Sequence, residues 1–198
     1  MTKVILLNGA SSSGKSSIVK ELQNILGELF LEMGVDRFMS MIPSNYQGFG
    51  PNASQMWTWE KSSDELGELV KLKLGPDGKK YVQCMYKCIK TMAENGFNVI
   101  VDDVCLDTEE LRNIAKELDN FKVYFIGIKC RLEILEQRER LKKNRIINSA
   151  RGQYDIVHQY NYDFEIDTSD LTSKDCALKI KEYIYKNSEP KAFKFYNL

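Results

Sequence analysis

One stretch near the start of the chain constrains the fold more than any other. Residues 9–16 read Gly-Ala-Ser-Ser-Ser-Gly-Lys-Ser and match the pattern G-x-x-x-x-G-K-[ST] at every position. An apolar run at residues 4–7 precedes this stretch, and residues 16–26 follow it with apolar side chains at helical spacing. A small-residue turn between a buried strand and a helix is the setting in which this pattern binds phosphate. The sequence therefore predicts an α/β domain that holds a nucleotide.

The composition of this loop indicates which groups hold the phosphates. Small residues let backbone N–H groups converge on phosphate oxygens at the positive end of the following helix. Lys15 is expected to bridge the β- and γ-phosphates, and Ser16 to offer a hydroxyl ligand to Mg²⁺. The loop alone does not separate kinases from GTPases, ATPases or motors. The expected nucleotide-binding residues are Gly9, Ala10, Ser11, Ser12, Ser13, Gly14, Lys15, Ser16 and Ser17.

Further apolar runs predict the rest of a parallel sheet that is covered on both faces. They lack the polar alternation of a half-exposed strand, and they occupy residues 98–101, 123–128 and, more weakly, 164–166. Residues 29–35 are a further strand candidate, in which Phe30, Leu31 and Val35 are apolar. Segments with helical periodicity separate them, at residues 109–118, 132–141 and 174–185, the last with Thr172 or Ser173 as its cap. Strands that alternate with helices predict a three-layer, doubly wound α/β/α fold.

Two other segments have the composition of irregular structure. Residues 45–64 are rich in Gly, Pro and Asn, and residues 75–78 read Gly-Pro-Asp-Gly, which favours a turn. We expect residues 45–81 to form an insertion that binds the acceptor. Trp57 and Trp59 are candidates to line its pocket, although aromatic residues serve core packing at least as often.

Composition and charge exclude several classes of protein. Lys plus Arg and Asp plus Glu each number 28, so no net charge attracts a nucleic-acid backbone. A hydrophobic share of 43% argues against a membrane partner, and 198 residues predict one domain over residues 1–198. The five cysteines are odd in number and scattered, which favours a reducing compartment, the cytoplasm. Nothing in the sequence indicates the oligomeric state.

Acidic residues follow two of the predicted strands. The run at residues 98–101 leads into Asp102 and Asp103, and Asp102 is the first choice for a carboxylate that holds Mg²⁺. A helix cap or a solvated strand end is the alternative, and adjacent side chains on a strand point to opposite faces. Asp36 follows the strand candidate at residues 29–35, where it could act as a general base or be an ordinary strand-end aspartate.

Basic residues predict a lid at residues 131–153. Arg138, Lys142 and Arg145 are spaced by four and three, so on one continuous helix they would share a face that closes over the nucleotide. The alternative is a solvated helix whose arginines pair with nearby acids, Glu139 among them. His158 is the single histidine, and a lone histidine is more often structural than catalytic.

Together these residues resemble the chloramphenicol phosphotransferase-like family of P-loop kinases. The resemblance is carried by residues 5–17, 34–36, 41–43, 99–104, 138–139, 145, 153, 157–158, 162–163 and 166–169. It implies the sheet order 2-3-1-4-5, Mg-ATP as cofactor, Asp36 as the base, and a lid with Arg138 and Arg145. It also implies a small-molecule hydroxyl acceptor, for which chloramphenicol, a nucleoside, a sugar and a sugar nucleotide all remain open. An ATP-gated regulatory protein is the alternative from another class.

Overall fold

A five-stranded parallel sheet lies at the centre of the protein, as a computed structural model that describes residues 2–65, 67–143 and 145–197 shows. Its strands run in the spatial order β2-β6-β1-β7-β8. Counted along the chain without the strands of a separate small sheet, this order is 2-3-1-4-5, so the predicted topology is confirmed. The five strands are β1 (Lys3–Asn8), β2 (Phe30–Gly34), β6 (Asn98–Asp103), β7 (Lys122–Lys129) and β8 (Phe164–Asp167).

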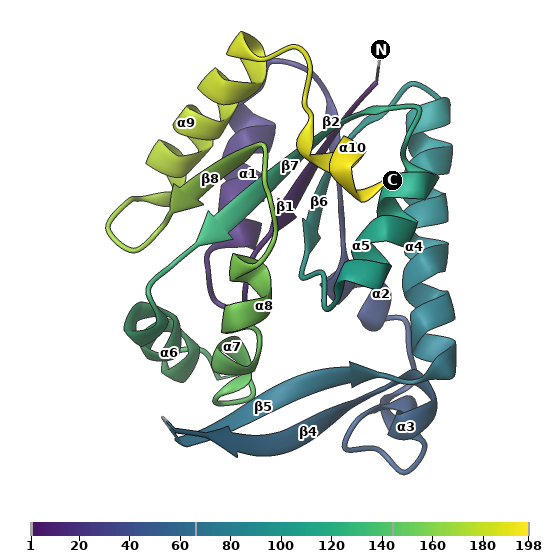
Figure 1. The fold of residues 1–198 in the computed structure, drawn as a ribbon, viewed down its shortest axis with the longest axis vertical. Coiled ribbons are helices and arrows are strands. Elements are labelled where there is room, and N and C mark those ends of the chain that lie inside the picture. The colour runs from purple at the N-terminus through teal and green to yellow at the C-terminus, as the bar shows by residue number, and fades with distance from the viewer. Residues whose placement is uncertain (1, 66, 144, 198) are drawn as a thin grey trace.

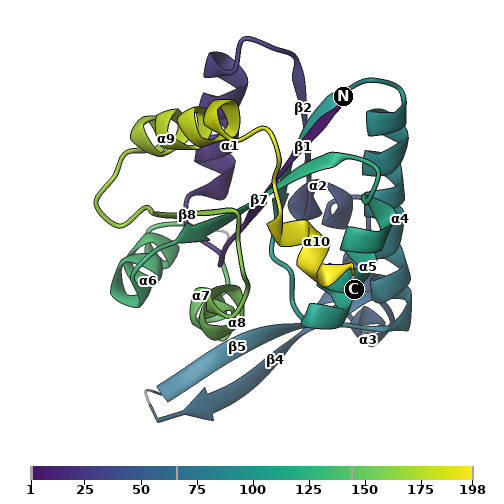
Figure 2. The same cartoon turned by 45° about the horizontal axis from the view of Figure 1, so that its top comes forward.

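Helices cover both faces of this sheet, which confirms the three-layer architecture (Figure 1; Figure 2). Alternate side chains of β1 divide between two cores, with Val4 and Leu6 on one face and Ile5 and Leu7 on the other. The first face packs against α4, α5 and α10, and the second against α1 and α9. These helices are α1 (Lys15–Ile25), α4 (Pro76–Glu94), α5 (Thr108–Glu117), α9 (Ser173–Lys186) and α10 (Ala192–Tyr196).

The segment expected to be irregular forms a long antiparallel hairpin instead. Strands β4 (Trp57–Asp64) and β5 (Gly67–Leu74) pair along their whole length, and the short β3 (Gln47–Gly48) joins them. Most of β4 is exposed, and its polar side chains therefore hid the strand from a search for apolar runs. The hairpin crosses the carboxyl-terminal edge of the central sheet (Figure 1).

The turn predicted at residues 75–78 is wrong, because these residues begin α4. Pro76 occupies the start of the helix, where its missing N–H is not needed. Gly78 lies against the backbone of α3 (Ala53–Met56), since an added Cβ would stand 1.8 Å from the Met56 carbonyl oxygen. Pro and Gly here permit a helix start and a close contact.

Short elements complete the sheet edge and the carboxyl terminus. The aromatic tail docks as α10, where the rings of Phe193 and Tyr196 pack on Phe125 of β7, and Asp163 Oδ1 accepts the N–H of Ala192 at 2.8 Å. No helix within the described part of the chain is long and apolar enough to cross a membrane. The remaining short helices are α2 (Val35–Met39), η1 (Ser44–Tyr46), α6 (Leu132–Arg140), α7 (Ser149–Gly152) and α8 (Tyr154–His158).

Candidate functional site

The phosphate loop lies between β1 and α1, as its sequence predicts. An added Cβ at Gly9 would meet the Ile128 carbonyl oxygen at 2.5 Å, and Gly14 has a φ of 100°, so both positions require glycine. The Lys15 ammonium donates to the carbonyl oxygens of Gly9 (2.8 Å) and Ala10 (3.1 Å). This arrangement holds a cation against the loop, directly at the start of α1.

Hydroxyl groups of the loop lack hydrogen-bond partners. The Oγ atoms of Ser11, Ser12 and Ser13 are buried, and no partner for them is found in the part of the chain that the structure describes. A buried hydroxyl without a partner is costly, unless a bound group satisfies it. Phosphate oxygens would accept hydrogen bonds from such hydroxyls, so the loop fits a nucleotide.

Ser16 and Asp102 bring two oxygen donors together beside the loop. The Ser16 hydroxyl donates to Asp102 Oδ2 at 2.6 Å, and Lys15 Nζ lies 3.6 Å from Asp102 Oδ1. The parallel register that pairs Leu7 with Asp102 places this carboxylate next to the loop. A hydroxyl and a carboxylate are hard oxygen ligands of the type that Mg²⁺ takes, so the pair fits that ion.

Asp103 has different surroundings from its neighbour. Its side chain is 1% exposed, accepts a hydrogen bond from the Tyr86 hydroxyl, and accepts the Val104 N–H at 2.7 Å. Burial raises the pKa of Asp103 to about 6. Of the two aspartates, Asp102 is the one whose carboxylate contacts Lys15 and Ser16. Its role in holding Mg²⁺ stays a prediction.

Asp36 lies in the first turn of α2 and faces the same cavity as the loop. This cavity has a volume of about 400 Å³, and its walls include Lys15, Asp36 and Asp102. The Asp36 side chain is 76% exposed, and its Oδ2 lies 3.6 Å from the Arg145 guanidinium. Trp57 of β4 also lines the cavity, and its buried Nε1 finds no partner among the described residues. The cavity thus joins a carboxylate, a cation and an aromatic wall to the phosphate loop.

The predicted continuous lid helix is wrong, because α6 ends at Arg140. Lys142 and Arg145 still line the cavity, but from the segment that follows the helix. Arg138 lies outside this cavity and lines a neighbouring one on the other side of the loop, where its guanidinium donates to the Thr168 carbonyl oxygen at 2.7 Å. Burial, followed by the charges of Arg145, Lys15 and Arg138, lowers the pKa of Lys142. The cations therefore gather near the loop without sharing a helix face.

Glu139 explains why the chain leaves the helix. Its side chain is 1% exposed and accepts hydrogen bonds from Asn148 N (2.6 Å), Ser149 Oγ (2.7 Å) and Ala150 N (2.9 Å). A buried carboxylate that collects three donors holds the start of α7, which favours the turn over continued helix. Its sequence position among arginines suggested surface ion pairs, so this contact was missed.

Gln153, at the end of the predicted lid region 131–153, contacts the phosphate loop. Its Oε1 accepts the Ser11 N–H at 2.7 Å, and the side chain is buried. The preceding α7 also contacts the hairpin, because the Asn148 carbonyl accepts the Val70 N–H at 3.1 Å. An added Cβ at Gly152 would stand 2.0 Å from the Val70 carbonyl oxygen. Gln153 was part of the family resemblance, but no local pattern indicated its partner.

The single histidine and two cysteines of α4 lie outside this cavity. His158 is exposed on α8, and its Nδ1 donates to the Tyr154 carbonyl oxygen at 2.7 Å. Cys84 and Cys88 are exposed on α4, and no group of three or more metal-binding side chains occurs within residues 2–65, 67–143 and 145–197. The functional candidates therefore concentrate at the carboxyl-terminal edge of the sheet, as open α/β sheets favour.

Solved structures of known kinases share this fold. The APS kinase of Mycobacterium tuberculosis, in complex with AMPPNP and APS, superposes with a TM-score of 0.63 at 16% identity, covering 93% of this chain and 98% of that one. Shikimate kinase from Acinetobacter baumannii, in complex with shikimate, gives a TM-score of 0.58 at 15% identity and covers 94% of each chain. At these identities the likeness shows the P-loop kinase fold.

Sequence comparisons are more specific. Proteins named "Putative O-phosphotransferase" in two strains of Mycobacterium tuberculosis are 28% identical over 193 residues, which is 96% of this chain and 86% of theirs. A guanylate kinase of Rickettsia prowazekii is 28% identical over 185 residues, 85% of this chain and 84% of that protein. The family described as "Chloramphenicol phosphotransferase-like protein" matches residues 2–185. The chain therefore belongs to the chloramphenicol phosphotransferase-like family.

Proposed function

We propose that the protein is an ATP-dependent O-phosphotransferase that moves the γ-phosphoryl group of ATP to a hydroxyl of a small molecule. One observation carries this proposal. A single cavity of about 400 Å³ joins the phosphate loop with Lys15, the Ser16–Asp102 pair and the Asp36 carboxylate. These are the parts that phosphoryl transfer to an alcohol needs, namely phosphate binding, charge neutralisation and a proton acceptor.

The nucleotide side of the reaction uses the phosphate loop. Backbone N–H groups and Lys15 hold the phosphate oxygens, and the Ser11, Ser12 and Ser13 hydroxyls add donors that have no other partner among the described residues. Ser16 and Asp102 would hold Mg²⁺. When bound, this ion neutralises charge on the β- and γ-phosphate oxygens.

The acceptor side uses Asp36. Its carboxylate takes the proton of the acceptor hydroxyl while the hydroxyl oxygen forms a bond to the γ-phosphorus, and the bond from phosphorus to the ADP oxygen breaks. Arg145, 3.6 Å from Asp36, orients the carboxylate and lies with Lys142 beside the transferring group. Both cations then stabilise negative charge in the transition state.

The free thiols support the cytoplasm as the site of this reaction.

The test is a measurement of ADP release with Mg-ATP across chloramphenicol, nucleosides and sugars, with mass spectrometry of the products. We expect one class of acceptor to gain a single phosphate and to accelerate ADP release. Replacing ATP by GTP in the same assay checks the donor. Hydrolysis that no acceptor accelerates would contradict the proposal and favour the regulatory alternative, in which nucleotide binding alters affinity for a partner.

A further inference from the structure

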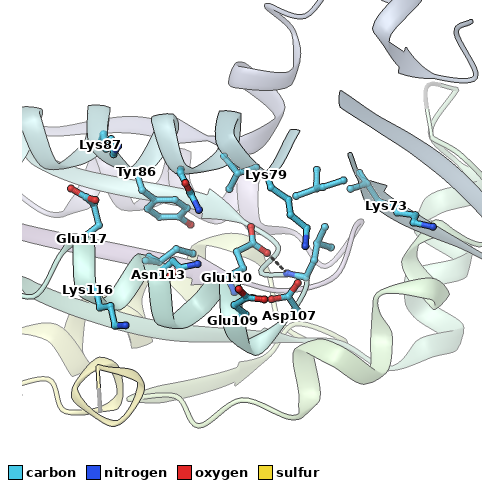
Figure 3. A pocket seen from close by; sticks show the side chains of 16 residues that line it. Lys73, Lys79, Tyr86, Lys87, Asp107, Glu109, Glu110, Asn113, Lys116 and Glu117 are labelled. Carbon is cyan, nitrogen blue, oxygen red and sulfur yellow. Dashed lines mark hydrogen bonds between the residues drawn. The ribbon is translucent and has the colours of Figure 1, made fainter. Parts of the chain in front are cut away.

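A second cleft adjoins the candidate active site. It lies between β5, α4 and α5 and has a volume of about 620 Å³ (Figure 3). Cavities of 300–1,000 Å³ are typical of sites for drug-sized ligands. The two cavities adjoin, because five residues line both of them: Leu72, Leu74, Val82, Leu106 and Glu110.

One face of the β4–β5 hairpin forms part of the wall of both cavities. Trp57 pairs with Leu74 and Trp59 with Leu72, so the four side chains lie on one face of the hairpin. The two tryptophans line the cavity at the phosphate loop, and the two leucines line both cavities. A molecule that extends beneath the hairpin from the phosphate loop towards the second cleft therefore meets these four apolar side chains.

The second cleft carries little net charge. Lysines and acidic residues line it in equal number. Lys73 lies on the opposite face of β5 from Leu72 and pairs with Glu60 at 2.6 Å. Glu117 pairs with Lys90 at 3.2 Å, so part of the charge at the rim is already compensated.

Glu110 lies where the two cavities meet. Its Oε2 accepts the Leu106 N–H at 2.7 Å, and Figure 3 shows its carboxyl group inside the cleft, together with Asn113 of α5. Burial, with the nearby charge of Asp103, raises the pKa of Glu110 to about 8. The group is therefore mostly neutral at pH 7, when it can also donate a hydrogen bond to an uncharged ligand.

We propose that this cleft is a subsite for the part of the acceptor remote from its reactive hydroxyl, and that this part is apolar and uncharged. The inference rests on the proposed function, because it requires the hydroxyl to lie near Asp36 while the body extends beneath the hairpin. The apolar wall contributes binding through burial, and each methylene group removed from water raises affinity about fourfold. Acceptors with a charged far end, such as sugar nucleotides, are disfavoured, because the lysines and acidic residues of the cleft balance and leave no net opposite charge to compensate them.

The test uses unbranched primary alcohols, which keep one hydroxyl and vary only the body. Ethanol, butanol, hexanol and octanol, together with 8-hydroxyoctanoate, are assayed for phosphorylated product and ADP release. Their binding in the presence of AMPPNP is measured in parallel by calorimetry. Asn113→Trp fills the cleft from an exposed position of α5, and Arg112→Trp is the matched control on the same helix outside the cleft. Gln83→Trp fills the cleft from α4 if the first variant fails to fold.

In the native enzyme we expect kcat/KM to rise with chain length, by up to about fourfold for each buried methylene group, and octanol to exceed 8-hydroxyoctanoate. Asn113→Trp should flatten this rise and leave ethanol unchanged, whereas Arg112→Trp should behave as the native chain. A flat native series, a preference for the charged acceptor, or an undiminished rise in both cleft-filling variants overturns the subsite.

The binding measurement separates this inference from the proposed function. If no alcohol is phosphorylated, yet affinity rises with length and loses that rise in Asn113→Trp, the subsite stands and the transfer to such alcohols does not. If alcohols are phosphorylated but neither kcat/KM nor affinity depends on chain length, the proposed function stands and the subsite does not. Absence of both transfer and length-dependent binding contradicts both.

Discussion

The phosphate loop and the β4–β5 hairpin are two walls of one cavity, yet they are specified in different ways. The loop is continuous in sequence, and residues 9–17 carry its glycines, its lysine and the Ser16 hydroxyl. The hairpin obtains its position from segments far away in the chain, through Asn148 and Gly152 of the lid region. The phosphate loop is thus encoded locally, whereas the wall that we propose for the acceptor depends on tertiary contacts. Four substitutions test this difference, from the largest expected effect to the smallest.

Lys15→Ala tests the locally encoded wall. We expect transfer to fall by about a thousandfold or more and ATP binding to weaken, because the ammonium is the cation closest to the loop. Single-turnover kinetics and calorimetric titration of AMPPNP measure the two effects. Lys20→Ala, at an exposed position of α1, is the control. Native turnover in Lys15→Ala would remove the loop from the mechanism.

Asp36→Asn tests the acceptor side while keeping the side-chain size. We expect kcat to fall by about 10²–10⁴-fold, because the amide cannot take the hydroxyl proton, and the Kd for ATP to stay unchanged. Steady-state kinetics with the acceptor that the product assay identifies measure this loss. Asp77→Asn, in the first turn of α4, should have native activity. A variant at Asp36 with undiminished kcat would show that another group is the base.

Gln153→Met tests the contact that joins the loop to the segment packed on the hairpin, residues 148–152. The change keeps the side-chain length but removes the oxygen that accepts the Ser11 N–H, and we expect kcat/KM for ATP to fall about tenfold. Gln159→Met places the same change at an exposed position and should have no effect. Thermal unfolding of both variants shows whether the loss is catalytic. Equal kinetics for the two variants would mean that this hydrogen bond does not position the loop.

Glu110→Gln tests a residue that lines both cavities, through the pH dependence of thermal stability. The pKa of Glu110 rises from an ordinary 4.5 to about 8 in the folded chain, so folding is favoured by the proton that the folded state retains. This contribution is complete below about pH 4.5 and is lost as the pH rises through 8. Because one pKa unit is worth about 1.4 kcal/mol, we expect this loss to lower Tm by about 3 °C or more between pH 6 and pH 8.

In Glu110→Gln, Tm should not show this part of the decrease between pH 6 and pH 8, because an amide does not titrate. Differential scanning calorimetry at pH 6, 7 and 8 measures the difference between the two proteins. Glu109→Gln, at the exposed neighbouring position of α5, is the control and should follow the native chain. If Tm decreases equally with pH in the native chain and in Glu110→Gln, the Glu110 carboxyl is not the cause of that decrease.

The sequence predicted elements well where the signal was short-ranged. Apolar runs located four strands of the central sheet, and the candidate at residues 29–35 the fifth. Thr172 caps α9 by accepting the Asp175 N–H at 3.1 Å. The predictions from the sequence were wrong where solvent exposure or long-range contacts determined the structure. The polar strand β4 was read as irregular, and Pro76 was read as part of a turn although it begins a helix.

For the candidate site, the sequence located each of the loop groups and the two carboxylates, because residue type and position after a strand carry that information. It placed Arg138, Lys142 and Arg145 on one helix, and the structure separates them, because Glu139 draws its hydrogen bonds from residues 148–150. Gln153, Glu110 and the second cleft needed the folded chain, since their partners are distant in sequence.

By itself, the sequence determined the α/β fold class, the phosphate loop and the acids at the edge of the sheet. Each depends on hydrophobic periodicity or on a motif within a few residues, where backbone geometry follows from local composition. Only the tertiary structure decided that the hairpin closes over the loop, that Asp36 lies beside Arg145, and that the lid contacts the hairpin. These arrangements come from packing and hydrogen bonds between distant segments, whose free energies no local pattern reports.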